Sequence, residues 1–227
     1  MAAYKTGWVT YQQDGYDLRA YTAAPEVGGP GVLVLHAWWG LTPFFERLCQ
    51  RLAERGFTAL APDLFGGQTA DTVDAARQLV ETHDSRLTGA AAFGGMKQLA
   101  RLEGVNPACL GTLGFSFGAA WALVLAEELP QVQATVLFYG SYEADFSRAQ
   151  AAFQGHFAEK DEWEPLEGIN AMQAAMQQAG RETAFHFYPA TGHWFFEDNR
   201  PDAYNPAAAE LAWERTLQFL AQKLGGA

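Results

Sequence analysis

One serine lies between two glycines in a pattern that could supply a nucleophile. Residues 114–118 read Gly-Phe-Ser-Phe-Gly; an apolar run leads into them and an alanine-rich stretch follows. Such a sequence is typical of a strand, a tight turn and a helix, the context in which a G-x-S-x-G serine attacks carbonyl carbons. We expect Ser116 to adopt a positive φ and to face the free N–H groups of the helix start. The alternative is a serine that stands between glycines by chance.

A serine hydroxyl is a weak nucleophile at neutral pH and needs a base to take its proton. Five histidines are available. His193 lies in the loop after the last predicted strand, from which it could reach back over the edge of a sheet, and we expect it to be the base. His36 ends an earlier strand, and we interpret it as a structural hydrogen-bonding residue near the pocket.

The acid that orients the base should lie between the serine and the histidine in chain order, just after a strand. The loop 159–165 holds four acidic residues that compete for this role. Asp161 is favoured because its short side chain would fix an imidazole tautomer with little freedom. Asp145, after the preceding strand, is the alternative, and an acidic loop can also be merely solvated. Asp63 also follows a strand, but we expect it to hold a loop by local hydrogen bonds.

An oxyanion would need two backbone N–H groups. We expect one from Phe117, directly after the nucleophile, and one from Trp38, in the loop after residues 32–35. Aromatic residues fall within or beside the predicted site loops and could line an apolar substrate pocket: Trp39, Trp163, Trp194 and Phe195. The other interpretation is that these rings pack down over the core.

Strand-like and helix-like segments alternate along the chain. Residues 7–12 and 16–22 flank Asp14-Gly15, which predicts a β-hairpin. Further strands are expected at 32–35, 57–61, 108–115, 133–139, 153–158 and 183–188. Helices are expected from Pro43 to Gly56, at 71–82, 88–102, 118–129 and 170–179, and from Asn205-Pro206 to about 224. This alternation predicts an α/β fold with a mainly parallel sheet, helices on both faces and ligands at the carboxyl ends of the strands.

Composition narrows the function classes. The chain has 227 residues, of which 49% are apolar, and we expect one domain over residues 1–227. A net charge of −11 argues against partners such as nucleic acids and anionic membranes.

No apolar run approaches the ~20 residues of a membrane span. The N-terminus lacks a signal-peptide pattern and only two cysteines are present, so we expect a cytoplasmic protein. We expect no metal and no organic cofactor. The oligomeric state stays open.

These motifs together resemble the dienelactone hydrolase family of α/β-hydrolases. The resemblance covers nearly the whole chain and rests on short segments: residues 32–35 with Trp39-Gly40, 61–64, the Ser116 turn, Lys160-Asp161, Gly192-His193 and the closing residues 212–220. It implies an α/β-hydrolase fold and a hydrolase activity. It is more specific to the family than to any one activity.

Three positions depart from the pattern of the family's namesake enzymes. Ser116 stands where they have cysteine, and Ala37 stands where they have a glutamate that helps to activate that thiol. These two departures are consistent, because a glutamate that helps to activate a thiol has no role where the thiol is absent. Glu197 stands at about the place of an arginine that holds a substrate carboxylate, so a carboxylate-bearing dienelactone is a poor substrate candidate.

We therefore expect a serine hydrolase that cleaves small carboxylic esters or lactones through an acyl-enzyme, with Ser116, His193 and Asp161 as its triad. One alternative keeps the triad and changes the bond, giving a thioesterase, amidase or peptidase. The other is a non-catalytic protein on the same fold that binds small molecules or partners, because fold alone does not decide function.

Overall fold

The computed structural model describes residues 3–225. The contacts within the chain divide it into two compact units, one that runs to Leu110 and one from Gly111 to Gly225. Each unit is described by itself. The prediction of a single domain stays a prediction.

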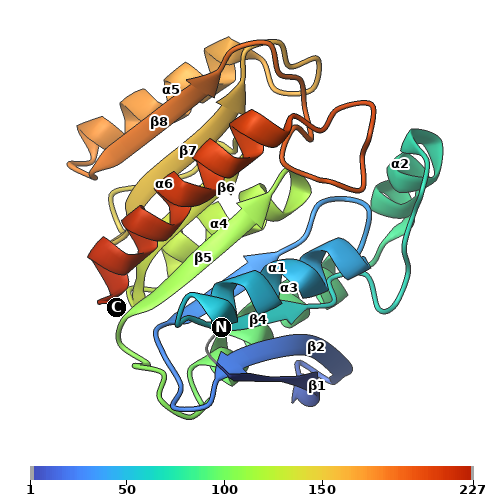
Figure 1. Cartoon of the computed structure of the whole chain (residues 1–227), viewed down its shortest axis with the longest axis vertical. Helices are drawn as coiled ribbons and strands as arrows, with labels where there is room; N and C mark the ends of the chain where they lie inside the picture. The colour runs from blue at the N-terminus through green and yellow to red at the C-terminus, as the bar shows by residue number, and fades with distance from the viewer. Residues whose placement is uncertain (1–2, 226–227) are drawn as a thin grey trace. The chain divides into compact units, whose positions relative to one another are not determined.

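Unit 1 is a four-stranded sheet with helices on its two faces (Figure 1). Its elements are β1 (Tyr4–Gln13), β2 (Tyr16–Pro25), β3 (Gly31–Leu35), α1 (Pro43–Glu54), β4 (Thr58–Pro62), α2 (Val73–Thr82) and α3 (Ser85–Leu99). The strand order is β1-β2-β4-β3, and only the β3–β4 pair is parallel. The hairpin prediction is confirmed. Asp14 and Gly15 have φ values of 52° and 84°, as a tight two-residue turn requires.

In unit 1, helix α1 begins as expected, whereas the start of helix α3 needs correction. Thr42 takes the N-cap position of α1 without a capping hydrogen bond from its hydroxyl, and Pro43 takes the first helical position. Helix α3 begins three residues earlier than expected, because the Asp84 side chain accepts a hydrogen bond from the N–H of Arg86. The helix runs through Gly94, where a Cβ would lie 2.7 Å from the Tyr11 ring, so the glycine permits close packing on the sheet.

His36 and Asp63 both hold the loop that follows β4, as expected. The His36 Nε2 accepts a hydrogen bond from the N–H of Leu64 at 3.0 Å, so Nδ1 carries the proton and donates to the carbonyl of Ala37. The Asp63 carboxylate accepts from the N–H of Phe65 and from Nε of Arg19. Both side chains are therefore structural.

The burial of His36 makes unit 1 sensitive to acid. Burial lowers the pKa of His36 from 6.5 to about 4. Between these values the unfolded chain binds a proton that the folded chain excludes, so stability should fall as the pH drops through this window. We expect a loss on the order of 3 kcal/mol between pH 7 and pH 4 from this residue. Urea unfolding at both pH values measures it, with His36→Gln as the non-titrating control. Equal pH dependence in the two proteins would contradict the prediction.

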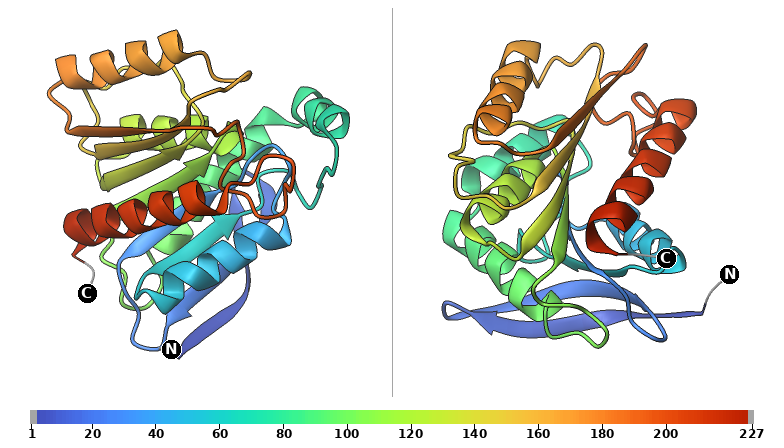
Figure 2. Two further views of the ribbon diagram at one scale, coloured as in Figure 1. Left: turned by 45° about the horizontal axis from the view of Figure 1, so that its top comes forward. Right: turned by 90° about the vertical axis from the view of Figure 1, so that its left-hand side faces the viewer.

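Unit 2 is a sheet in the order β5-β6-β7-β8, in which β6, β7 and β8 run parallel. Its elements are β5 (Leu110–Phe115), α4 (Phe117–Glu128), β6 (Val132–Phe138), β7 (Ala152–Ala158), α5 (Leu166–Gln178), β8 (Thr183–Tyr188) and α6 (Pro206–Leu224). Helices α4 and α5 lie on one face of this sheet and α6 on the other (Figure 2). The core contains stacked aromatic rings, among them Phe115 and Phe138 at 4.7 Å.

The strand predictions in unit 2 are confirmed to within two residues, and β8 agrees at both ends. Helix α5 begins at Leu166, four residues before the expected start, directly after Pro165. Helix α6 begins as expected, because the Asn205 side chain accepts from the N–H of Ala208. Across residues 3–225, every helix is too short or too polar to cross a bilayer.

Candidate active site

Ser116 occupies the sharp turn between β5 and α4. Its backbone has φ 48° and ψ −112°, the strained conformation expected from the sequence. Its N–H donates to the carbonyl of Phe138 at 2.9 Å, which ties the turn to the end of β6. A Cβ on Gly114 would lie 2.5 Å from the carbonyl oxygen of Gly118. The glycine therefore lets strand and helix pass closely enough to form the turn.

His193 reaches Ser116 from the loop after β8. Its Nε2 lies 3.0 Å from Oγ of Ser116, and its Nδ1 lies 2.9 Å and 2.8 Å from the two carboxylate oxygens of Asp161. A carboxylate only accepts, so Nδ1 carries the proton and donates it. Nε2 is then free to accept the hydroxyl proton of Ser116. The side chains of His193 and Asp161 are each only 4% exposed, which limits competition from water.

Asp161 is itself held in place by the loop after β7. Its Oδ1 also accepts hydrogen bonds from the N–H groups of Trp163 and Glu164, at 2.9 and 3.0 Å. This turn fixes the carboxylate before it meets the imidazole. The neighbouring acid Glu159 instead accepts from the N–H of Ala190. Of the four acids in this loop, Asp161 is therefore the one whose carboxylate accepts from His193.

The alternative acid, Asp145, is not brought to the imidazole. Its carboxylate is exposed and accepts from the N–H of Ser147 within its own loop. Local capping of this kind is the common role of a loop aspartate.

The two expected oxyanion donors lie in different units. Phe117 is the first residue of α4, so its N–H lies at the positive end of the helix. Trp38 lies in unit 1 between β3 and α1, and its ring is 5.4 Å from that of Trp39. Trp38 as the second donor stays a prediction.

Two of the expected pocket residues flank His193. The ring of Trp194 lies 4.9 Å from the imidazole and that of Trp163 lies 6.4 Å from it, and the Trp163 side chain is 40% exposed. Phe195 is fully buried against Tyr188, a placement that favours a packing role. Trp39 is also buried, in unit 1, and its pocket role stays a prediction.

Sequence reasoning missed Tyr139. We expected it to be the last residue of a strand, but β6 ends at Phe138 and Tyr139 turns away with φ 38°. Its ring lies 4.9 Å from the His193 ring, and its hydroxyl donates to Oε1 of Glu197 at 2.8 Å. The sequence signal for this turn was the glycine at position 140, directly after Tyr139. A Cβ at Gly140 would lie 2.7 Å from the carbonyl oxygen of Ser116, so the close approach requires glycine.

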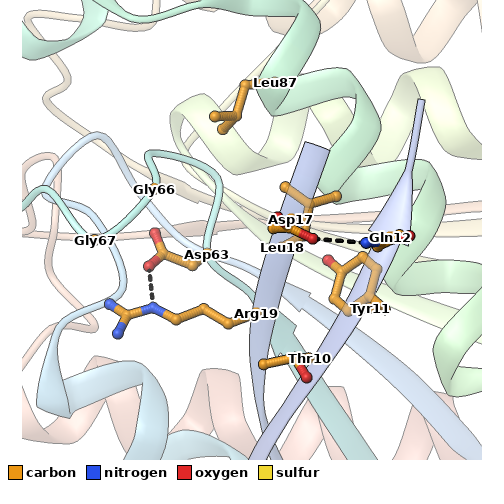
Figure 3. A pocket seen from close by; sticks show the side chains of 10 residues that line it. All are labelled: Thr10, Tyr11, Gln12, Asp17, Leu18, Arg19, Asp63, Gly66, Gly67 and Leu87. Carbon is orange, nitrogen blue, oxygen red and sulfur yellow. Dashed lines mark hydrogen bonds and ion pairs between the residues drawn. The ribbon is translucent and has the colours of Figure 1, made fainter. Parts of the chain in front are cut away.

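Unit 1 has a groove of its own, of about 830 Å³, beside the hairpin (Figure 3). Arg19 projects into it, paired with Asp63 and stacked 4.7 Å over the Trp8 ring. Among the described residues that line this groove, none is serine, cysteine or histidine. Nor does any part of residues 3–225 gather three or more His, Cys, Asp or Glu side chains in a way that could hold a metal ion.

Comparison with known proteins identifies the family of the chain. The model of the dienelactone hydrolase family matches residues 18–224. The chain belongs to the dienelactone hydrolase family. The resemblance seen in the sequence is confirmed, and this family member is a hydrolase.

Individual dienelactone hydrolase relatives match over nearly their full length. The chain is 30% identical over 221 residues to the "Putative carboxymethylenebutenolidase" of Aquifex aeolicus, covering 93% of this chain and 96% of the relative. It is also 30% identical to the "Probable 2-oxo-3-(5-oxofuran-2-ylidene)propanoate lactonase" of a Bradyrhizobium species, covering 96% and 95%.

A solved structure confirms the α/β-hydrolase fold. A "Putative Dienelactone Hydrolase" from Klebsiella pneumoniae superimposes with a TM-score of 0.85 at 25% identity, covering 97% of this chain and 99% of that one.

Proposed function

We propose that this hydrolase cleaves small carboxylic esters or lactones with a serine nucleophile, through an acyl-enzyme. One observation carries the proposal: Oγ of Ser116, the imidazole of His193 and the carboxylate of Asp161 form a continuous hydrogen-bonded chain. Nucleophile, base and orienting acid each meet the next at 2.8–3.0 Å, the geometry that activates a serine. The names of the relatives, a carboxymethylenebutenolidase and a lactonase, support lactones as one substrate class.

The chemistry follows from these contacts. Oγ of Ser116 attacks the carbonyl carbon while Nε2 of His193 takes the hydroxyl proton. Asp161 keeps the proton on Nδ1 and offsets the charge of the imidazolium. The imidazolium then gives its proton to the leaving alkoxide, which departs as an alcohol. Water attacks the acyl-serine by the same proton traffic and releases the acid.

Backbone N–H groups stabilise the tetrahedral intermediate. The N–H of Phe117 supplies one hydrogen bond to the oxyanion, aided by the positive end of α4, and the N–H of Trp38 supplies the second. Each such donor contributes about 10²–10³-fold to kcat in serine hydrolases. Trp163 and Trp194, which flank His193, favour acyl or aryl groups that are small and uncharged.

A fluorophosphonate probe tests the nucleophile directly. It should form one covalent adduct, located by mass spectrometry on Ser116, because only a hydroxyl activated by a base attacks the phosphorus at a useful rate. Protein unfolded in urea is the control and should not react. An adduct on another residue would rule out Ser116 as the nucleophile, and no adduct on the folded protein would favour the non-catalytic binder.

A substrate panel then separates the bonds that the triad could cleave. Matched ester, lactone, thioester and amide substrates with the same acyl group should give the highest kcat/KM for the oxygen esters. A preference for the thioester or amide would replace the proposed activity with that of a thioesterase or amidase. Neutral and carboxylate-bearing lactones of equal size test the expected preference for uncharged substrates.

A further inference from the structure

A buried tyrosine–glutamate pair lies next to His193, with the tyrosine ring in contact with the imidazole. Tyr139 and Glu197 both have fully buried side chains, and the tyrosine hydroxyl donates to Oε1 of the glutamate at 2.8 Å. The other carboxyl oxygen, Oε2, is buried without a hydrogen-bond partner among residues 3–225. Leaving a buried acceptor unpaired is costly, so this arrangement needs an explanation beyond packing.

Of this pair, Tyr139 is the member that lies beside Ser116 and His193. The ring of Tyr139 lies 4.9 Å from the ring of His193 at an interplanar angle of 55°. The backbone of the tyrosine follows directly on Phe138, whose carbonyl accepts the N–H of Ser116. Tyr139 is also anchored by its own N–H, which donates to the carbonyl of His156 at 2.9 Å. The tyrosine thus touches the base and adjoins the support of the nucleophile.

Backbone strain sets these contacts apart from ordinary packing. A bulky residue with positive φ is rare and costs on the order of 1–3 kcal/mol. Tyr139 has φ 38°, and Trp194, directly after His193 in the chain, has φ 65°. Strain of this kind persists only where the surroundings hold the residue firmly, and here the hydroxyl of Tyr139 is held by Glu197.

We propose that Tyr139 and Glu197 are positioning residues that hold the His193 imidazole in line between Ser116 and Asp161. The inference rests on the proposed function, because it assigns the pair to the base of that triad. The Tyr139 ring limits tilting of the imidazole, and the hydrogen bond to Glu197 limits rotation of the tyrosine. Burial raises the pKa of the Glu197 carboxyl to about 7 and raises the pKa of Tyr139, so the hydroxyl keeps the proton that it donates.

Four variants test the pair by kinetics. Tyr139→Phe removes the hydroxyl and keeps the ring, and we expect it to lower kcat about tenfold with little change in KM. Glu197→Leu should have a similar effect. Glu197→Gln keeps a carbonyl that can accept the hydrogen bond and should stay within about twofold of wild type. Tyr188→Phe is the matched control, since its buried hydroxyl contacts His156 rather than the triad.

A spectroscopic readout follows the imidazole independently of turnover. The proton on Nδ1 of His193, shared with Asp161, should give a low-field NMR signal. We expect this signal to broaden or shift in Tyr139→Phe and Glu197→Leu, and to be unchanged in Tyr188→Phe and Glu197→Gln. Thermal unfolding of all four variants shows how much stability each one loses.

The outcomes separate this inference from the proposed function. Wild-type kcat and an unchanged signal in both Tyr139→Phe and Glu197→Leu would overturn the positioning role and leave the triad intact. A loss of kcat in Tyr188→Phe equal to that in Tyr139→Phe would mean general destabilisation and would also overturn it. Failure of the triad itself would instead appear as the absence of a fluorophosphonate adduct on wild-type Ser116.

Discussion

Replacing Ser116 with alanine is expected to lower kcat for ester hydrolysis by about 10⁴–10⁶-fold, close to complete loss. Oγ is the only non-hydrogen atom that the substitution removes, and it lies 3.0 Å from Nε2 of His193. Alanine can adopt the same strained turn at the cost that serine already bears, and the N–H of residue 116 still donates to Phe138. The folded structure should therefore survive, with binding of substrate nearly unchanged.

Steady-state kinetics with a short-chain nitrophenyl ester measures this effect. Ser147→Ala is the matched control, because Ser147 is an exposed serine of the same unit that lies outside the triad. It should retain wild-type kcat. Hydrolysis that persists in Ser116→Ala at a tenth or more of the wild-type rate would rule out this serine as the nucleophile.

Asp161→Asn is expected to lower kcat by a factor on the order of 10⁴ while the protein stays folded. Oδ1 of Asp161 accepts the N–H groups of Trp163 and Glu164, so the amide oxygen of asparagine should take that place. The amide nitrogen then faces Nδ1 of His193, where Oδ2 lies at 2.8 Å in the wild type. Because an amide nitrogen only donates, the imidazole must carry its proton on Nε2. In that tautomer it cannot accept the proton of Ser116.

The comparison for this variant is Asp145→Asn, which tests the other acid that the sequence allows. Asp145 caps its own loop and should leave kcat unchanged when amidated. If Asp145→Asn instead produced the larger loss, the acid of the triad would have been assigned to the wrong loop. The tautomer can be read separately, since a proton on Nε2 rather than Nδ1 moves the imidazole nitrogen resonances in NMR.

That Ser116, His193 and Asp161 come together could be predicted from the sequence, because chemistry restricts the residue types and the fold restricts their places. A serine in a strand-to-helix turn, an acid after one strand and a histidine after another must meet at the carboxyl edge of a parallel sheet. The sequence also indicated the structural roles of His36 and Asp63, since each follows a strand that ends in a loop. The periodicity of apolar residues and the capping residues predicted the ends of the helices and strands to within a few residues.

What escaped prediction depends on tertiary packing. Nothing in the residue types shows that Tyr139 leaves the strand at a positive φ, or that its side chain contacts His193 and Glu197, which lie far along the chain. The aromatic residues of the site loops share one residue class, yet Trp163 is partly exposed and Phe195 is buried. Helix α3 passes through Gly94-Gly95 because a neighbouring ring requires the space, and propensity alone cannot reveal that.

The left-handed residues of unit 2 have a consequence for how this protein can evolve. Ser116, Tyr139, Ala190 and Trp194 all have positive φ, and all lie in the turns and loops that follow β5, β6 and β8. Glycine tolerates that conformation without penalty, so selection for heat resistance alone would favour glycine at the exposed Ala190, at little cost to turnover. The same exchange at Tyr139 or Trp194 would remove a ring that lies beside His193. Selection for stability should therefore favour glycine at Tyr139 and Trp194, whereas selection for catalysis should retain their rings.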